Sequence, residues 1–297
     1  MKTLIKNGTL ISPSDTFQSD ILIEDETITR LGLNLEADSD QRVDASGKFI
    51  LPGGVDPHVH LDLPMFNTVS SDDHYTGHKA AAFGGTTTVM DFVPLSPRPS
   101  PAGRGVGVRE GEGDFQYSVD LWMRKAEKAA IDYSFHMNLT QFNDRIAKEI
   151  PSLRSMGIQT LKVFTAYNGR LRIDDGSIFK AMQIARDNGM LVMAHCENGD
   201  VIETLVADAL AAGHTTPEWH ALTRPGWGAI DATLRVAGMA ADADASVYIV
   251  HMNAGGEVDM LKYARERGVK VMGETCLQYL FFTAEHLRRP DGAKWIC

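Results

Sequence analysis

Four histidines at the ends of short apolar runs have the side chains and the spacing needed to bind metal ions. His58 and His60 flank a single valine, so an extended backbone would place both imidazoles on one face. His195 closes the run "MLVMAH", and His251 closes "SVYIVH". Neutral imidazole nitrogens are ligands that suit zinc. The four histidines therefore predict a metal site, provided that the fold brings the ends of these runs together.

Lys162 occupies an unusual position, the second residue of the apolar run "LKVF". A buried ammonium group is costly unless it finds a partner or loses its proton. A desolvated, neutral amine could react with carbon dioxide to give a carbamate, which is a bidentate anion able to bridge two metal ions. Alternatively, the ammonium could pair with a carboxylate such as Asp91 or Glu197. The residues alone leave both interpretations open.

Seven apolar runs, each followed by a helix-like segment, are expected to position these side chains. Parallel strands that alternate with helices and carry polar residues at their C-terminal ends are typical of a β/α barrel. A doubly wound sheet shows the same alternation, but polar residues at so many strand ends favour a barrel. In a barrel these ends surround one shared opening, the mouth. We therefore predict an α/β fold, a TIM-like (β/α) barrel with seven of its eight strands apparent. The polar residues are His58, Asp91, His136, Lys162, His195, His251 and Glu274.

Two of these strand-end residues have a less direct role in the prediction. Asp91 and His136 are expected either to orient the ligands through hydrogen bonds or to satisfy polar groups of the barrel. Cys196 follows His195 directly and should face away from the mouth in a strand, so we do not expect it to be a nucleophile.

The chain is expected to have two domains. Residues 1–52 alternate apolar and polar side chains, with expected turns at "NG" and "SPSD", and predict short antiparallel strands of a small N-terminal β-sandwich. Residues 53–297 are predicted to form the barrel, incomplete at its C-terminus. Two segments interrupt the alternation of apolar runs and helix-like segments. Residues 94–114 predict a long loop, and residues 213–228 are a second long excursion.

Composition narrows the class of partner. The 297 residues have a formal net charge of -10 and include three cysteines. This acidity argues against nucleic acid and against a polybasic membrane patch, because both need clustered positive charge. No run is long and apolar enough for a membrane span. We expect a soluble, cytoplasmic protein with free thiols at Cys196, Cys276 and Cys297, acting on a small molecule.

Several segments together carry a specific resemblance. They are "LPGGVDPHVHLDLPM", "TVSSDD", "GHKAAAFGGTTTVMDF", "LKVFTAY", "AHCENGD", "HALTRP", "IVHMNAGGEV" and "GETCLQYL". Through these segments the chain resembles the dihydropyrimidinase and D-hydantoinase type of cyclic amidohydrolase. The resemblance extends from the N-terminal strands to Cys297. The resemblance implies zinc-dependent opening of the cyclic amide bond of dihydropyrimidines or 5-substituted hydantoins to N-carbamoyl amino acids, the first being a reaction of pyrimidine catabolism.

The resemblance also implies roles for the metal-binding residues. His58 and His60 match ligands of one zinc ion, and His195 and His251 match ligands of a second. Lys162 matches the carboxylated lysine (N6-carboxylysine) that bridges the two ions. The implied cofactor is therefore two Zn²⁺ per chain.

Other residues match positions that meet the substrate, a cyclic ureide. Tyr167 matches the catalytic tyrosine whose hydroxyl holds the developing oxyanion. Leu63, Met65 and Phe66 match a loop that shapes the pocket for the exocyclic group of the substrate. A homotetramer is the implied assembly.

Members of this group extend beyond the last residue of this sequence. The resemblance places the eighth strand after Cys297, together with an aspartate that ligates the first zinc and shuttles the proton. We expect an open barrel with unpaired edges and exposed apolar faces. The alternative to an enzyme is a truncated, non-catalytic remnant or an interaction scaffold with the same fold.

Overall fold

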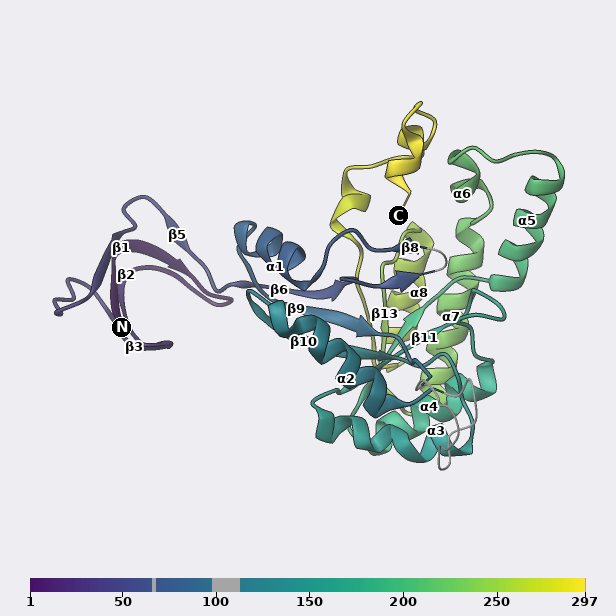
Figure 1. Ribbon diagram of the computed structural model, residues 1–297, viewed down its shortest axis with the longest axis horizontal. Coiled ribbons are helices and arrows are strands. Elements are labelled where there is room, and N and C mark those ends of the chain that lie inside the picture. The colour runs from purple at the N-terminus through teal and green to yellow at the C-terminus, as the bar shows by residue number, and fades with distance from the viewer. Residues whose placement is uncertain (66–67, 98–112, 297) are drawn as a thin grey trace. The chain divides into compact units, whose positions relative to one another are not determined.

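The computed structural model describes residues 1–65, 68–97 and 113–296. These residues form two compact units (Figure 1). One unit comprises Met1–Asp56 and Ala80–Thr88. The other comprises Pro57–Lys79 and Val89–Cys297 and contains every histidine and lysine of the predicted site. Phe66 and most of the expected loop at 94–114 lie outside the described residues.

A seven-stranded sheet organises the site-bearing part of the chain. Its order is β14-β13-β12-β11-β10-β9-β6, so each strand lies beside its predecessor among the predicted runs. Each of the seven apolar runs contains one of these strands, and the predicted barrel architecture is confirmed as a curled parallel sheet with helices. The strands are β6 (Gly54–Val59), β9 (Thr86–Val93), β10 (Asp132–Asn138), β11 (Thr160–Phe164), β12 (Leu191–His195), β13 (Val247–Ile249) and β14 (Val271–Gly273).

Strand register separates the two faces of this sheet. Lys162 pairs with Met193, which pairs with Tyr248, so these residues form one row across β11, β12 and β13. Because neighbouring side chains of a strand point to opposite faces, Leu161 and Val192 belong to the other face. That second face packs into the large apolar core beneath the helices. Lys162 therefore points away from the helices, toward the interior of the curled sheet.

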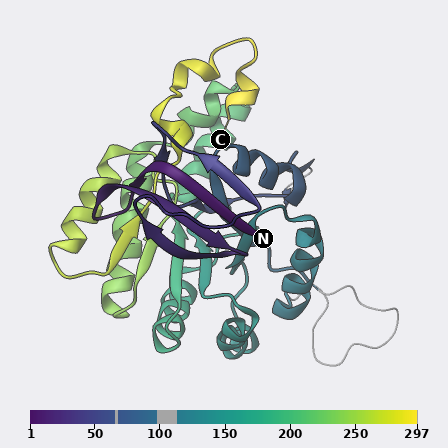
Figure 2. The same ribbon diagram turned by 90° about the vertical axis from the view of Figure 1, so that its left-hand side faces the viewer.

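Helices cover the outer face of this sheet. In Figure 2, helices coloured teal to yellow-green surround the strands, and apolar side chains of α2, α4, α7 and α8 join the same core. The helices are α1 (His74–Phe83), α2 (Phe115–Lys125), α3 (Asp144–Glu149), α4 (Asp175–Asp187), α5 (Gly199–Ala211), α6 (Glu218–Leu222), α7 (Gly226–Asp242), α8 (Gly255–Arg265) and α9 (Ala284–Leu287), with 3-10 turns η1 (Ala126–Lys128), η2 (Ile150–Met156), η3 (Leu277–Leu280) and η4 (Gly292–Trp295).

The predicted excursion at 213–228 contains α6, which lies beside α9. Arg288 joins Glu218 through an ion pair of 3.0 Å. Among the described residues, no helix combines the length and the apolar character that crossing a bilayer requires.

The N-terminal strands form a separate sheet, in which the predicted antiparallel pairing is confirmed for three strands and wrong for two. Strands β1 (Lys2–Ile11), β2 (Thr16–Glu24) and β3 (Thr27–Gly32) are antiparallel neighbours, but β4 (Gln41–Asp44) and β5 (Phe49–Ile50) run parallel to β1. A hairpin turn can join only antiparallel neighbours. Residues 33–40 instead carry the chain from the β3 edge of the sheet to the far side of β1, which permits the parallel pairing.

The expected turn at Asn7 and Gly8 is a β-bulge inside β1. The register of β1 against β2 shifts between Ile5 and Gly8, and Asn7 has a φ of 63°. A Cβ at Gly8 would overlap the Ile50 side chain, so glycine is required by a close approach and not by a chain reversal. The "SPSD" segment does form the turn between β1 and β2.

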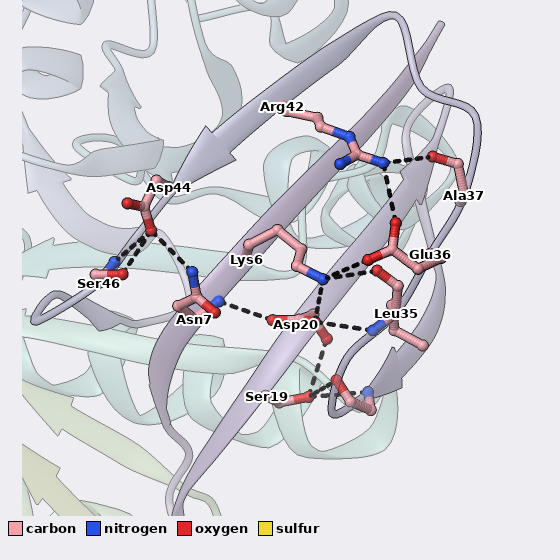
Figure 3. Close-up of polar contacts among 11 residues, drawn as sticks. Lys6, Asn7, Ser19, Asp20, Leu35, Glu36, Ala37, Arg42, Asp44 and Ser46 are labelled. Atoms are coloured by element: carbon pink, nitrogen blue, oxygen red, sulfur yellow. Dashed lines mark hydrogen bonds and ion pairs between the residues drawn. The ribbon is translucent and has the colours of Figure 1, made fainter.

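A buried carboxylate organises this bulge (Figure 3). Asp20 is 3% exposed and accepts hydrogen bonds from the backbone N–H groups of Asn7 at 2.7 Å and Leu35 at 2.9 Å. The ammonium of Lys6 lies 3.2 Å from the same carboxylate. These contacts, above all the N–H of Asn7, lower the pKa of Asp20 despite its burial.

A candidate metal centre at the strand ends

The four predicted histidine ligands meet at the C-terminal ends of three strands. His58 lies in β6, His60 follows that strand, His195 ends β12, and His251 comes two residues after β13. The ring centroids are separated by 5.2 Å for His58 and His60, 5.4 Å for His58 and His251, and 4.8 Å for His195 and His251. The aromatic ring of Phe92 lies beneath the first pair, 4.5 Å from His58. The shared mouth that the sequence predicts is thus present in the structure.

The distance between two ring nitrogens fits a shared metal ion. Nδ1 of His195 lies 3.2 Å from Nε2 of His251. Two nitrogen ligands of a tetrahedral zinc ion, each at about 2.0–2.1 Å, are separated by about 3.3 Å. The other ring nitrogen of His195, Nε2, lies 2.7 Å from Oε2 of Glu197 and so has a carboxylate acceptor for its proton. This contact leaves the lone pair of Nδ1 on the side of His251.

A second carboxylate contacts the other histidine pair. Oε1 of Glu274 lies 2.5 Å from Nδ1 of His58, and its Oε2 accepts a hydrogen bond from the Tyr248 hydroxyl at 3.1 Å. Although burial opposes ionisation, the contact with His58 keeps the pKa of Glu274 below its ordinary value. Glu274 is therefore an anion at neutral pH.

Lys162 lies in the interior of the sheet, where no carboxylate of the described residues pairs with it. It is 1% exposed, and burial lowers the pKa of its amine from 10.5 to about 7. Its Nζ lies 4.9 Å from the ring centroid of Phe92 and 5.3 Å from that of Phe164. Within the described part of the chain it forms no ion pair, so the expected alternative of a partner such as Asp91 or Glu197 is not supported. A large fraction of this amine is neutral at physiological pH, as carbamate formation requires.

Desolvation keeps three of the imidazoles in the neutral form that binds metals. Desolvation of its ring, followed by the nearby His58 and Lys162, lowers the pKa of His60 to about 3. The residue as a whole is nevertheless exposed. Burial also lowers the pKa values of His195 and His251. His251 has a φ of 38°, an uncommon conformation for a residue with a side chain, and such conformations are concentrated at functional sites.

The donor set fits a two-ion arrangement better than a single cage. In the described ranges, no group of three or more His, Cys, Asp or Glu side chains is arranged around one point. The imidazoles form two pairs instead, and a buried amine that could become an anion lies in the same mouth. A carboxylated Lys162 would supply the shared ligand that both pairs lack.

Asp91 and His136 hold the backbone on either side of the two-histidine strand end. Asp91 accepts hydrogen bonds from the indole of Trp122 at 3.0 Å and from the N–H of Leu61 at 3.4 Å. His136 contacts the carbonyl of Pro57 through Nε2 at 2.9 Å. Desolvation raises the pKa of Asp91 to about 7 and lowers that of His136 to about 4. Both residues therefore satisfy polar groups of the barrel and also fix the backbone that flanks His58 and His60.

The predicted substrate residues are placed differently from one another. The ring of Tyr167 lies 5.1 Å from that of His195, and its φ of 67° turns the chain at the end of β11. Leu63 is 5% exposed and packs in the core, which favours a packing role. Met65 is 38% exposed in β7 (Pro64–Met65), which pairs antiparallel with β8 (Thr68–Val69). Phe66 lies outside the described residues.

Cys196 faces the core, as its place after His195 predicts. It is 5% exposed, belongs to the large apolar cluster, and burial raises the pKa of its thiol to about 12.

In the excursion at 213–228, the ring of His214 stacks on Trp219, with the ring centroids 3.9 Å apart. Arg224 donates a hydrogen bond to the carbonyl of His220. Although burial opposes ionisation of Glu197, the contact of Glu197 with His195 lowers its pKa, and the charge of Arg224 adds a smaller contribution in the same direction.

Three residues support the site in roles that the sequence does not predict. Glu274 is predicted only as a strand-end residue and Glu197 only as a possible partner of Lys162. The third residue is Thr165. Its hydroxyl accepts from the N–H of Glu197 and contacts the carbonyl of His195, which fixes the turn between them. A polar residue two positions after a strand-end histidine is a signal that could have identified Glu197.

The parallel β/α sheet carries histidine pairs and a buried lysine at one mouth, and the amidohydrolase family profile matches residues 49–289. The chain belongs to the amidohydrolase family. It is 40% identical over 300 residues to the D-hydantoinase of Geobacillus stearothermophilus and 42% identical over 304 residues to that of Streptomyces coelicolor. The crystal structure of dihydropyrimidinase from Brevibacillus agri superposes with a TM-score of 0.91 at 42% identity, covering 99% of this chain and 62% of that one. All of this chain aligns, but it spans only 61% and 62% of the two D-hydantoinases.

Proposed function

We propose that this chain provides the metal-binding mouth of a zinc-dependent hydrolase that opens the cyclic amide bond of dihydropyrimidines or 5-substituted hydantoins. The names of its relatives, D-hydantoinase and dihydropyrimidinase, support this substrate class, and its family is generally metal-dependent. The observation that carries the proposal is the amine of Lys162, buried and unpaired with any described carboxylate beside four imidazoles.

Carboxylation of Lys162 is part of the proposal. The neutral amine adds to the carbon of carbon dioxide: an N–C bond forms, one C=O π bond breaks with its electron pair moving to oxygen, and one proton of the amine passes to water, which yields a carbamate anion. In this form Lys162 would ligate two ions at once, while His58 and His60 hold one ion and His195 and His251 hold the other. The anion would also replace a costly buried ammonium with a charge that the metal ions neutralise.

The remaining residues bind and polarise the substrate. When bound, the two zinc ions would supply Lewis-acid polarisation of the ring carbonyl and would lower the pKa of the attacking water. Tyr167 would donate its hydroxyl proton in a hydrogen bond to the oxygen that gains negative charge. Burial raises the pKa of Tyr167, so this donor stays protonated at neutral pH. The oxygen of the water would bond to the ring carbonyl carbon and the ring C–N bond would break. One proton of the water would pass to the leaving nitrogen and the other to solvent, which gives the carboxylate of an N-carbamoyl amino acid.

The test measures zinc and ring opening on the same 297-residue protein. Elemental analysis of a gel-filtered sample should give about two zinc ions per chain, as a bridged site requires, and Lys162→Ala should lose them. The absorbance of dihydrouracil or a 5-substituted hydantoin should fall with wild type and zinc, but not with Lys162→Ala. Leu161→Met, which changes the neighbouring residue on the opposite face, is the matched control and should behave as wild type. Zinc near zero in a folded protein would refute the proposal and favour the non-catalytic alternative.

We also propose a homotetramer. Sedimentation equilibrium of the same sample gives the assembly, and a monomeric mass across the concentration range would contradict this part of the proposal alone.

A further inference from the structure

Glu274 connects two strands that lie at opposite ends of the sheet. It follows β14 directly, and its carboxylate lies 2.5 Å from Nδ1 of His58 in β6. In the order of the sheet, β6 and β14 are the first and last of the seven strands. This contact therefore joins the two edges at the mouth, across 216 residues of sequence. The side chains are 11% and 14% exposed, so the pair is largely shielded from water.

The position of Glu274 is fixed from several directions. Its N–H donates to the carbonyl of Ile249 at 3.0 Å, and its carbonyl accepts from the N–H of Met252 at 2.8 Å. These bonds lie on either side of His251 in the chain. The second carboxylate oxygen accepts from the Tyr248 hydroxyl at 3.1 Å, which prevents the carboxylate from rotating away from His58.

We propose that Glu274 is a positioning residue, held by Tyr248, which presents Nε2 of His58 to a metal ion and ties β6 to β14 at the mouth. The carboxylate accepts the proton of Nδ1, so the lone pair of the neutral ring must lie on Nε2. The metal part of this inference rests on the proposed function. The other carboxylate–imidazole contact, between Glu197 and His195, joins residues two positions apart, so it orients a ring without linking remote strands.

The experiment compares metal affinity in four variants of the full chain. Affinity for Co²⁺ alone is measured by competition with a chelator, without substrate. Glu274→Ala should bind Co²⁺ about 10- to 100-fold more weakly, which is the usual loss when the partner of a metal-bound imidazole is removed. Glu274→Gln should stay within a few-fold of wild type, because its amide oxygen can still accept from Nδ1. Tyr248→Phe should fall between the two. Asp20→Asn, which removes a buried carboxylate from the other unit, should lower the melting temperature without changing the affinity.

Nitrogen-15 NMR of the histidine rings gives a second readout that a merely structural role would not change. In the metal-free protein, His58 should carry its proton on Nδ1 in wild type and in Glu274→Gln, and should become a mixture of tautomers in Glu274→Ala.

The outcomes separate this inference from the proposed function. Equal Co²⁺ affinity in wild type and Glu274→Ala would overturn the positioning role and leave the hydrolase proposal intact. Weakened binding in Glu274→Ala by a chain that opens no hydantoin would support positioning and refute the hydrolase. A parallel loss of affinity in Asp20→Asn would show that general destabilisation is the cause, and a wild-type chain that binds no Co²⁺ would also overturn the inference.

Discussion

Replacing Lys162 with methionine should stabilise the metal-free protein at neutral pH. The amine is 1% exposed and, within the described chain, contacts aromatic faces and no carboxylate. Burial lowers its pKa from 10.5 to about 7. At pH 7 the unfolded chain holds a full proton on this residue, whereas the native chain holds only about half. Methionine has a similar length and no charge, so it removes this difference.

The size of the effect follows from the pKa difference. One pKa unit corresponds to about 1.36 kcal/mol, so the shift from 10.5 to about 7 costs on the order of 4 kcal/mol at pH 7. Imperfect packing of the methionine offsets part of this gain, and we expect a net stabilisation of about 2–4 kcal/mol. For a domain of this size, the melting temperature should rise by roughly 5–10 °C.

The same pKa difference fixes how the free energy of unfolding changes with pH. Because the native pKa is lowered, the native state binds fewer protons than the unfolded state between about pH 7 and pH 10.5. Wild-type stability should therefore rise with pH across this window, and the advantage of Lys162→Met should shrink until it vanishes near pH 10.5.

Urea unfolding followed by tryptophan fluorescence tests this expectation. The proteins are treated with a chelator and kept in carbonate-free buffer, so that neither metal nor carbamate contributes. Leu161→Met serves as the control for the packing change and should cost less than about 1.5 kcal/mol at every pH. The reasoning fails if Lys162→Met is no more stable than wild type at pH 7, or if the gap between them does not narrow as the pH rises.

Three further predictions concern other buried groups. Asp20→Asn should destabilise the N-terminal sheet by about 1–3 kcal/mol at pH 7, measured by urea unfolding; because the pKa of Asp20 is lowered, the difference from wild type should disappear as the pH falls through that pKa. Cys196 should resist iodoacetamide in the native state and react only in urea, as mass spectrometry can show, because its thiol is buried and has a pKa of about 12. Gly199→Ala should lower the melting temperature, with a loss of about 1–3 kcal/mol, because the new Cβ would lie 2.8 Å from the Cα of Ala166; an unchanged value would show that α5 shifts freely.

The barrel strands were predictable because each signal is local. An apolar run that ends in a polar residue, such as the run closed by His195, reflects burial on both faces of a strand and the opening of the mouth at its end. Lys162 stood out because its charge interrupts such a run. The bulge at Asn7 and Gly8 was mistaken for a turn because its cause is not local: the side chain of Ile50 and the carboxylate of Asp20 approach from other strands.

The clustering of the candidate ligands was predictable, but the residues that orient them were not. Ligand types are set by their chemistry, so His58 and Lys162 can be recognised in the sequence. The partner of His58 is Glu274, 216 residues away, and only the curling of the sheet brings them together. The positive φ value of Tyr167 also arises from the tertiary structure, since tyrosine does not favour that conformation by itself.

The cost of Lys162 in the metal-free fold leads to an opposite expectation when zinc is present. A metal that binds only the native state stabilises it by about 2.7 kcal/mol at a hundredfold excess over its dissociation constant. In Lys162→Met no carbamate can form, so the two histidine pairs lack their shared anion and should bind zinc weakly. Zinc should therefore raise the melting temperature of wild type in bicarbonate buffer far more than that of the variant, and the order of stability should reverse. Equal stabilisation of both proteins would mean that Lys162 is not a ligand, whatever its effect on the metal-free fold.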